Sequence, residues 1–146
     1  MLNIDLHCHS NISDGVLPPA QLVERAAMRG VEILALTDHD DITGLVEARQ
    51  MAEAKSITFI NGVEISVSWR GRTLHIIGLD IDPAHAPLIE GLAAIRAGRA
   101  QRAENIALEL EKAGIPDSLA GAYAHVGERR LIGRTHFARF LVEQGY

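Results

Sequence analysis

The sequence predicts an α/β fold in which a strand-rich first part is followed by a helical segment. Short apolar runs alternate with amphipathic stretches up to about residue 82, glycine and proline separate these stretches, and no strand pattern follows Asp82-Pro83. Strand–helix–strand–helix order is typical of parallel pairing with right-handed crossovers. We therefore expect residues 1–82 to build a parallel sheet with covering helices and residues 83–146 to be helical.

The expected elements follow from periodicity and from helix-end signals. Strands are expected at residues 2–6, 33–37, 57–65 and 73–79. A first helix should begin near Pro19, because proline suits a first helical turn, and should end at Arg29 before Gly30. Thr43 can cap a second helix that ends near Lys55. Helical patterns also cover residues 86–113, 118–124 and 135–144.

Length and composition fit one globular domain and exclude several classes of protein. The chain has 146 residues with 14 basic against 19 acidic side chains, which argues against a general electrostatic nucleic-acid binder. No apolar run approaches the roughly 20 residues that a membrane span requires, and no leader pattern opens the chain. Cys8 is the single cysteine, so no intramolecular disulfide can form. These features predict a cytoplasmic protein that binds no membrane.

Two histidines, one residue apart, lie at the end of the first expected strand. Because side chains of a strand alternate between its faces, Asp5, His7 and His9 should project to one side. Leu6 and Cys8 should project to the other, where packing is expected for Cys8. Neutral imidazoles on a rigid backbone are typical metal ligands, and a nearby carboxylate can orient one ring. The pair therefore predicts a metal site.

Further potential metal ligands follow along the chain: Asp14, His39, Glu64 and His75. The carboxyl ends of parallel strands in a barrel-type fold meet around one cavity, so these side chains should converge. Four imidazoles and two carboxylates are too many for one tetrahedral ion. They suit two or more divalent ions that share a carboxylate such as Glu64 and hold a hydroxide between them. That hydroxide is the expected nucleophile, and no side chain is assigned that role.

Some of these residues also have a purely structural interpretation. Asp14 precedes Gly15 in a common turn dipeptide, and His75 could be a hydrogen-bonded strand histidine. Three further aspartates around His39 are expected to serve the turn, the next helix or hydrogen bonds to the ligands: Asp38, Asp40 and Asp41.

The ordered motifs resemble those of the PHP family, the polymerase and histidinol phosphatase domains. The motifs are His7-x-His9-Ser10, Asp14-Gly15, Thr37-Asp38-His39, Gly62-Val63-Glu64 and His75. The resemblance implies the first part of a distorted (β/α)7 barrel in residues 1–82. It also implies two or three divalent metal ions, manganese first, with iron or zinc as alternatives. The implied ligand sets are His7, His9 and Glu64; Glu64 and His75; and Asp14 with His39.

Residues 83–146 look like the helical insertion of a PHP subgroup that acts on nucleoside bisphosphates or on the ends of short RNA. Guanidinium groups suit phosphate oxygens. The candidate phosphate contacts are Arg134 and His136, followed by Arg99 and Arg102. The other arginines of this segment are Arg96, Arg129, Arg130 and Arg139. For most arginines of the segment, a solvated helix surface is the alternative interpretation.

The resemblance implies metal-dependent hydrolysis of a phosphate monoester, in a small nucleotide such as a nucleoside 3',5'-bisphosphate or in a short RNA end. One alternative is an amidohydrolase-type C–N bond hydrolase, which also opens with Asp-x-His-x-His. Many such enzymes bridge their metals with a carboxylated lysine at a strand end, whereas Lys55 and Lys112 fall in expected helices. The other alternative is a non-catalytic metal-binding scaffold, which the full set of early ligands disfavours.

Two further features bear on the substrate and on the extent of the chain. Few aromatic side chains are available to stack on a base, and the visible candidates are Trp69, Tyr123 and Phe137. A small nucleotide is therefore favoured over long nucleic acid. The family's later ligands, a further histidine and a Ser-Asp-x-His-type motif, are not in this sequence. Since such a barrel ordinarily needs roughly 200 or more residues, we expect the first half of a longer protein.

Overall fold

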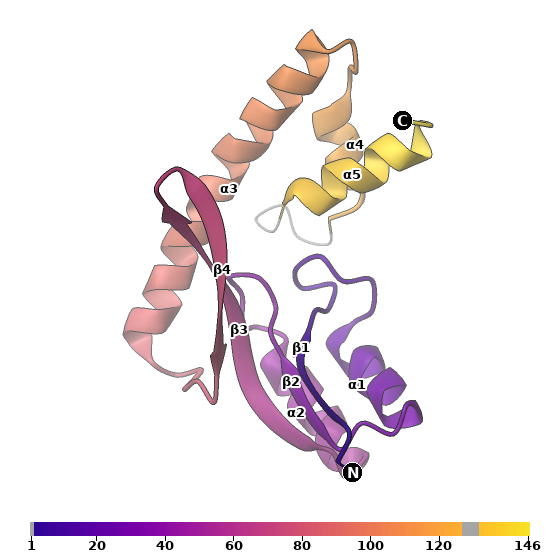
Figure 1. The fold of residues 1–146 in the computed structure, drawn as a ribbon, viewed down its shortest axis with the longest axis vertical. Coiled ribbons are helices and arrows are strands. Elements are labelled where there is room, and N and C mark those ends of the chain that lie inside the picture. The colour runs from indigo at the N-terminus through magenta and orange to yellow at the C-terminus, as the bar shows by residue number, and fades with distance from the viewer. Residues whose placement is uncertain (1, 127–131) are drawn as a thin grey trace. The chain divides into compact units, whose positions relative to one another are not determined.

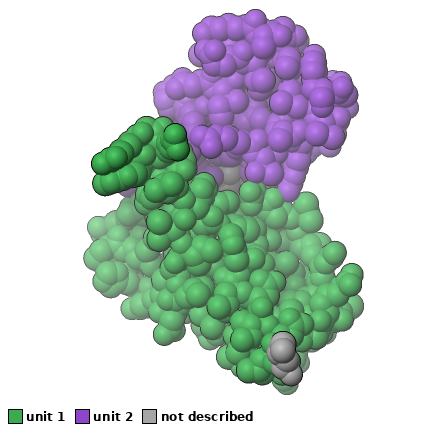
Figure 2. All heavy atoms as spheres, viewed as in Figure 1, with its two compact units in different colours: residues 1–92 green, residues 93–146 purple. Residues whose placement is uncertain are grey.

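The computed structural model describes residues 2–126 and 132–146, so Arg129 and Arg130 lie outside the described residues. Contacts divide the chain into two compact units, residues 1–92 and residues 93–146, which Figure 2 shows in different colours. Unit 1 is mixed α/β, and every element of unit 2 in the described part of the chain is helical.

A sheet of four strands in the order β1-β2-β3-β4 forms the centre of unit 1 (Figure 1). The strands β1 (Ile4–Cys8) and β2 (Ile33–Leu36) run parallel to each other and to the first part of β3 (Thr58–Trp69). The helices α1 (Pro19–Met28) and α2 (Leu45–Ala54) connect these strands. Parallel pairing, which the alternation of strand and helix predicted, is therefore confirmed for the first three strands.

The fourth strand, β4 (Arg72–Leu79), pairs antiparallel with β3. The two are joined by Arg70 and Gly71, whose φ angles are 49° and 76°. Positive φ at both central residues is the signature of the two-residue turns that close antiparallel hairpins, whereas parallel strands need a crossover of about a dozen residues. His75 consequently lies inside a hairpin, opposite Ser66, and not at the carboxyl end of a parallel strand.

The strand β3 is longer than the expected residues 57–65, and Glu64 lies within it and does not close it. The cause is a change of partner along β3. Its first part pairs with β2 as far as Asn61, and from Gly62 onward it pairs with β4. Beyond the end of β2, Glu64 also forms a single parallel bridge with His39. This bridge places the loop after β2 beside the middle of β3.

The helices α1 and α2 pack side by side against the sheet and enclose the core of unit 1 (Figure 1). The buried members of this core are Val23, Leu34, Leu36, Leu45, Ala48, Ala52 and Ile57. Ala35 between the two leucines of β2 is also buried, as expected for a strand covered on both faces. The expected cap of α2 is wrong, because Gly44 occupies the N-cap position and the Thr43 hydroxyl donates to Asp41.

Unit 2 contains most of α3 (Ala86–Lys112), with α4 (Ser118–Ala124) and α5 (Arg134–Glu143). These three helices agree with the sequence prediction to within one residue at each end. Their shared core contains the buried residues Ala103, Ala122, Ile132 and Phe137. Within residues 2–126 and 132–146, no helix combines the length and the apolar character that crossing a membrane requires.

Candidate metal centre

The six predicted ligands of unit 1 gather into one cluster. It consists of three overlapping groups, and within each group the ligand atoms lie within 4.8 Å of one another. The groups are His7, His9 and Glu64; His9, Asp14 and His39; and His39, Glu64 and His75. Their segments are the end of β1, the loops after β1 and β2, the middle of β3, and β4. The fold therefore brings together side chains that lie far apart in the sequence.

The carboxylate of Glu64 lies at the centre of the cluster. Its Oε2 atom is 2.8 Å from Nε2 of His7, 3.0 Å from Nε2 of His9 and 3.7 Å from Nδ1 of His39. Its Oε1 atom is 3.3 Å from Nδ1 of His75. The side chain is only 8% exposed, so the imidazoles, and not bulk water, surround its charge. One carboxylate therefore contacts all four rings.

Asp14 and His39 form another side of the cluster. The carboxylate oxygens of Asp14 lie 3.7 Å from Nδ1 of His9 and 3.7 Å from Nε2 of His39. Burial lowers the pKa of His39 and is the largest influence on it, while the charges of Asp14 and Glu64 act in the opposite direction. His39 is thus favoured in the neutral form, which is the form that binds a metal ion.

The donor atoms fit divalent metal ions. The Nε2 atoms of His7 and His9 lie 3.0 Å apart, and both face the same oxygen of Glu64. Two imidazole nitrogens and a carboxylate oxygen this close direct their lone pairs at a common point, where a cation relieves their repulsion. Imidazole and carboxylate ligands suit ions such as zinc, iron and manganese.

The loop around His39 is held by its buried aspartates, as the sequence predicted. Each carboxylate accepts bonds of 2.6–2.8 Å from serine or threonine: Asp38 from Ser10 and Ser13, Asp40 from Ser66, and Asp41 from Thr43. Desolvation raises the pKa of Asp38, and the hydrogen bonds from its two serines lower it. These bonds tie the loop after β1, the start of α2 and β3 to the same short segment.

The three serines were missed by the sequence interpretation, although their positions carried a signal. Ser10 and Ser13 lie between the candidate ligands His9 and Asp14, so their hydroxyls are close in sequence to both side chains. Ser66 follows Glu64 by two residues, a spacing that puts both side chains on the same face of a strand.

Cys8 packs away from the cluster, as its position in the strand predicted. Its thiol donates to the carbonyl oxygen of Ala35 at 3.2 Å. Burial, together with the charges of Asp5 and Asp38, raises the pKa of the Cys8 thiol to about 12. The thiol is therefore protonated at neutral pH and is a poor metal ligand.

This environment predicts slow alkylation of Cys8. At pH 8.5 we expect the native protein to react with iodoacetamide at least about a hundredfold more slowly than the same chain unfolded in urea, because its raised pKa leaves little thiolate. Mass spectrometry of samples quenched over time measures both rates. The native rate should rise with pH well beyond pH 9. Equal rates for the native and unfolded chains would contradict the assignment of Cys8 to the packed face.

The four predicted phosphate contacts all lie in unit 2. Arg102 and Arg134 are exposed, whereas Arg99 is 9% and His136 only 2% exposed. Nδ1 of His136 accepts the backbone N–H of Gly133 at 3.0 Å at the start of α5. The Arg99 guanidinium lies 3.6 Å from the point that a Cβ on Gly133 would occupy. Unit 2 therefore brings Arg99 and His136 to the same helix end, and His136 also stabilises that end.

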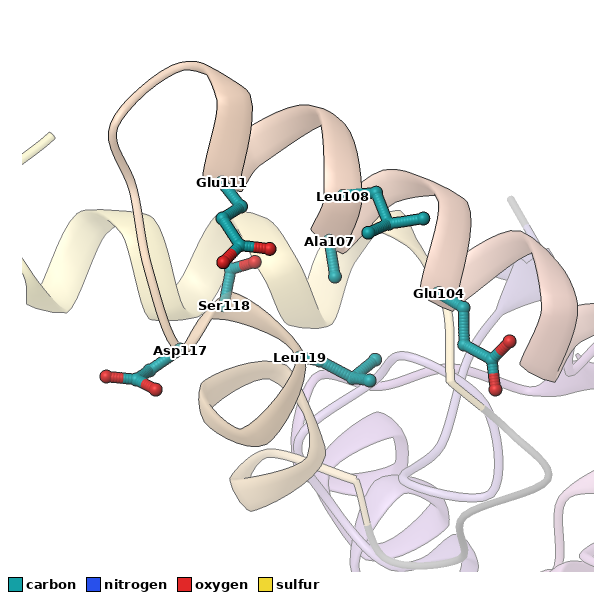
Figure 3. A pocket seen from close by; sticks show the side chains of 7 residues that line it. All are labelled: Glu104, Ala107, Leu108, Glu111, Asp117, Ser118 and Leu119. Carbon is teal, nitrogen blue, oxygen red and sulfur yellow. The ribbon is translucent and has the colours of Figure 1, made fainter.

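A cavity of about 450 Å³ lies between α3 and α4 in unit 2 (Figure 3). Its walls are Glu104, Ala107, Leu108, Glu111, Asp117, Ser118 and Leu119. Three carboxylates line this space, and a phosphate group placed there would meet charges of its own sign. The cavity is therefore unsuited to a phosphorylated substrate.

The candidates for base stacking differ in their availability. Phe137 is only 3% exposed and belongs to the core of unit 2, so the expectation that it stacks on a base is wrong. Tyr123 packs against the same core. Trp69, by contrast, is 62% exposed, and the guanidinium of Arg70 lies 5.6 Å from its ring centre.

The fold and the cluster define a mixed α/β protein with a histidine- and carboxylate-rich candidate metal centre, and comparison with known proteins identifies its family. The model of the PHP domain matches residues 5–116, and the chain belongs to this family. A 3',5'-nucleoside bisphosphate phosphatase of Chromobacterium violaceum is 51% identical over 145 residues, which are 99% of this chain and 51% of that protein. A 5'-3' exoribonuclease of Haemophilus influenzae is 49% identical over 142 residues, 97% of this chain and 51% of that protein. The chain thus spans about half the length of these relatives.

Two solved structures are similar to the chain over nearly its whole length. One is described as an amidohydrolase from Chromobacterium violaceum with bound sulfate and no metal. It is 51% identical with a TM-score of 0.95, and the match covers 98% of this chain and 50% of that chain. The other, from Bifidobacterium adolescentis, is described as a metal-dependent phosphoesterase. It is 32% identical with a TM-score of 0.89 and covers 99% of this chain and 51% of its own.

Proposed function

We propose that the protein is a metal-dependent phosphoesterase that hydrolyses a phosphate monoester of a small nucleotide, such as a nucleoside 3',5'-bisphosphate, or of a short RNA end. The observation that carries this proposal is the contact of one buried carboxylate, Glu64, with four imidazoles. The names of the two relatives that are about half identical support the substrate class.

Two or three divalent ions are the proposed cofactors, with manganese first and iron or zinc as alternatives. His7, His9 and Glu64 would hold one ion, Glu64 and His75 a second, and Asp14 with His39 a third; the three groups of neighbouring ligand atoms support this division. Bound ions would supply an acidified water and positive charge for the phosphate oxygens. Because manganese, iron and zinc accept the same ligands, the choice among them is left to measurement.

The chain's own residues perform the remaining tasks. Glu64 partly offsets the ionic charge from a buried position, which strengthens each attraction inside the site. Burial favours the neutral form of His39, which has a free lone pair for a metal ion. The protonated form would have no free lone pair. Arg134 and His136, then Arg99 and Arg102, are the proposed contacts for the substrate phosphate.

In this proposal residues 1–82 are the N-terminal part of a distorted (β/α)7 barrel and residues 83–146 are a helical insertion. The parallel pairing of β1, β2 and β3 supports the barrel assignment. The change of secondary structure after β4 supports the insertion. A cytoplasmic location stays a prediction from composition.

The amidohydrolase alternative is weaker, although one similar structure carries that description. A bridging carboxylated lysine has no counterpart here, because the chain's two lysines pair elsewhere: Lys55 with Glu24 and Lys112 with Glu109. The non-catalytic alternative, a scaffold that has lost ligands, is disfavoured because all six ligand side chains expected in residues 1–82 are present.

The proposal is tested with the full-length protein. We expect it to release phosphate from a nucleoside 3',5'-bisphosphate or a 5'-phosphorylated short RNA in the presence of manganese. Removal of metal by a strong chelator should lower the rate at least about a hundredfold, and adding manganese back should restore it. A dihydropyrimidine or similar cyclic amide serves as the comparison substrate. Undiminished phosphatase activity in the presence of the chelator would contradict the proposal. Hydrolysis of the cyclic amide without hydrolysis of any phosphate ester would contradict it as well.

A further inference from the structure

The buried carboxylate of Asp38 accepts three hydrogen bonds from the segment between the ligands His9 and Asp14. Its Oδ1 atom accepts the backbone N–H of Ser10 at 2.8 Å and the hydroxyl of Ser13 at 2.6 Å. Its Oδ2 atom accepts the hydroxyl of Ser10 at 2.6 Å. Asp38 is only 2% exposed, and a carboxylate is costly to bury without such donors. The segment is therefore held firmly against Asp38.

The bond between Ser13 and Asp38 determines what Ser13 can offer to His9. A serine hydroxyl has one proton, and at 2.6 Å from a carboxylate oxygen that proton is donated to Asp38. Toward Nδ1 of His9, 3.4 Å away, the Ser13 oxygen can then only accept. Asp14 adds a second acceptor on this side, 3.7 Å from the same nitrogen.

These acceptors favour a proton on Nδ1 of His9 and a free lone pair on its Nε2. Nε2 is the nitrogen that lies 3.0 Å from the Glu64 carboxylate and 3.0 Å from Nε2 of His7. Metal-binding histidines commonly donate their other ring N–H to a hydrogen-bond acceptor, which orients the ring and selects the ligating nitrogen.

We propose that Asp38, acting through Ser13, is a positioning residue that keeps the His9 ring oriented with Nε2 as its metal-binding atom. This inference rests on the proposed function, because it assumes that the cluster binds divalent ions. It assigns to Ser13 a role in metal affinity that is separate from its role in holding the loop.

A similar arrangement on the other side of His39 holds β3. Ser66 donates its backbone N–H to Oδ1 of Asp40 at 2.6 Å and its hydroxyl to Oδ2 at 2.8 Å. Ser10 and Ser66 thus each present an N–H and an O–H to the two oxygens of one buried aspartate. Ser13 differs from both, because its hydroxyl also faces an imidazole.

The test is the variant Ser13→Ala in the full-length protein, with zinc as the probe because it is diamagnetic. Zinc affinity is measured by competition with a chromophoric chelator, and long-range ¹H–¹⁵N NMR reports which nitrogen of His9 carries the proton. We expect zinc to bind about 10–100-fold more weakly than to the wild type. In the metal-free variant, the fraction of neutral His9 protonated at Nδ1 should fall.

The matched control is Thr43→Val. The Thr43 hydroxyl donates the same kind of bond, 2.6 Å to Oδ1 of Asp41, and Asp41 belongs to none of the three groups of ligand atoms. This variant should retain both zinc affinity and the His9 tautomer. Wild-type affinity in Ser13→Ala, an unchanged tautomer, or an equal loss of affinity in Thr43→Val would each overturn the inference.

The outcomes separate this inference from the proposed function. A wild-type protein that binds zinc but hydrolyses no phosphate ester would contradict the proposed function. The zinc affinity and the His9 tautomer of Ser13→Ala would still decide the role of Ser13. A wild-type protein that binds no divalent ion would overturn both.

Discussion

Replacing Glu64 by glutamine in the full-length protein should weaken divalent-metal binding at least about a hundredfold and slow phosphate-ester hydrolysis about a thousandfold. Glutamine keeps the shape of the side chain but removes the charge that faces four imidazoles. The backbone bonds of this position, to Asp38 and from Asp40, remain available to glutamine. The variant should therefore fold while losing its metal, which elemental analysis and a phosphate-release assay together measure.

The control for this variant is Glu47→Gln. Glu47 is a carboxylate on α2 that accepts the backbone N–H of Ala20 at 3.1 Å and lies outside the cluster. It should retain wild-type metal content and turnover. Circular dichroism should show the same fold in both variants. If Glu64→Gln keeps the metal content and activity of the wild type, the central role of this carboxylate is wrong.

The second large effect is expected for Gly15→Ala. A Cβ at this position would lie 2.7 Å from the carbonyl carbon of His9 and 2.8 Å from that of Ser10, and closer still to the carbonyl oxygen of His9. These are backbone atoms and cannot rotate away as a side chain would. The loop that carries Asp14 must therefore shift. We expect a loss of about 1–3 kcal/mol of folding free energy, together with weaker metal binding.

Thermal unfolding and metal titration of Gly15→Ala measure these two effects. Gly91→Ala is the matched control, because no atom lies within 4 Å of a Cβ at this position on α3. Alanine is the better helix former, so this variant should be as stable as the wild type or up to about 1 kcal/mol more stable. Equal stability of Gly15→Ala and Gly91→Ala would show that the loop tolerates a side chain at position 15.

The helices and the parallel strands were predictable because their apolar periodicity and end signals agree. Proline at the start of α1 and glycine after α3 mark ends that the structure shows within one residue. The direction of β4 was the main feature not predicted. Glycine was expected to separate these two strands, but the antiparallel pairing and the positive φ angles of Arg70 and Gly71 were seen only in the structure.

The convergence of the candidate ligands was largely predictable, since histidines and carboxylates near strand ends are expected to meet. Glu64 and His75 join the cluster by a different route, through a long strand and its hairpin partner. The hydrogen bonds of Asp38 and Asp40 needed the structure, because their serine partners are 25 to 28 residues away in the sequence. The serines lie next to predicted ligands in the sequence, but a single sequence does not show which distant aspartate each serine contacts.

The candidate ligands are spread from residue 7 to residue 75, so in the proposed centre bound cations would stabilise the native state. An ion bound by these side chains would join segments that lie far apart in the unfolded chain, so it would act as a reversible cross-link. Each tenfold rise in free cation above the dissociation constant then adds about 1.4 kcal/mol to the native state. If the proposed centre binds its ions, depletion of the ion should therefore lower the stability of the folded protein as well as its activity.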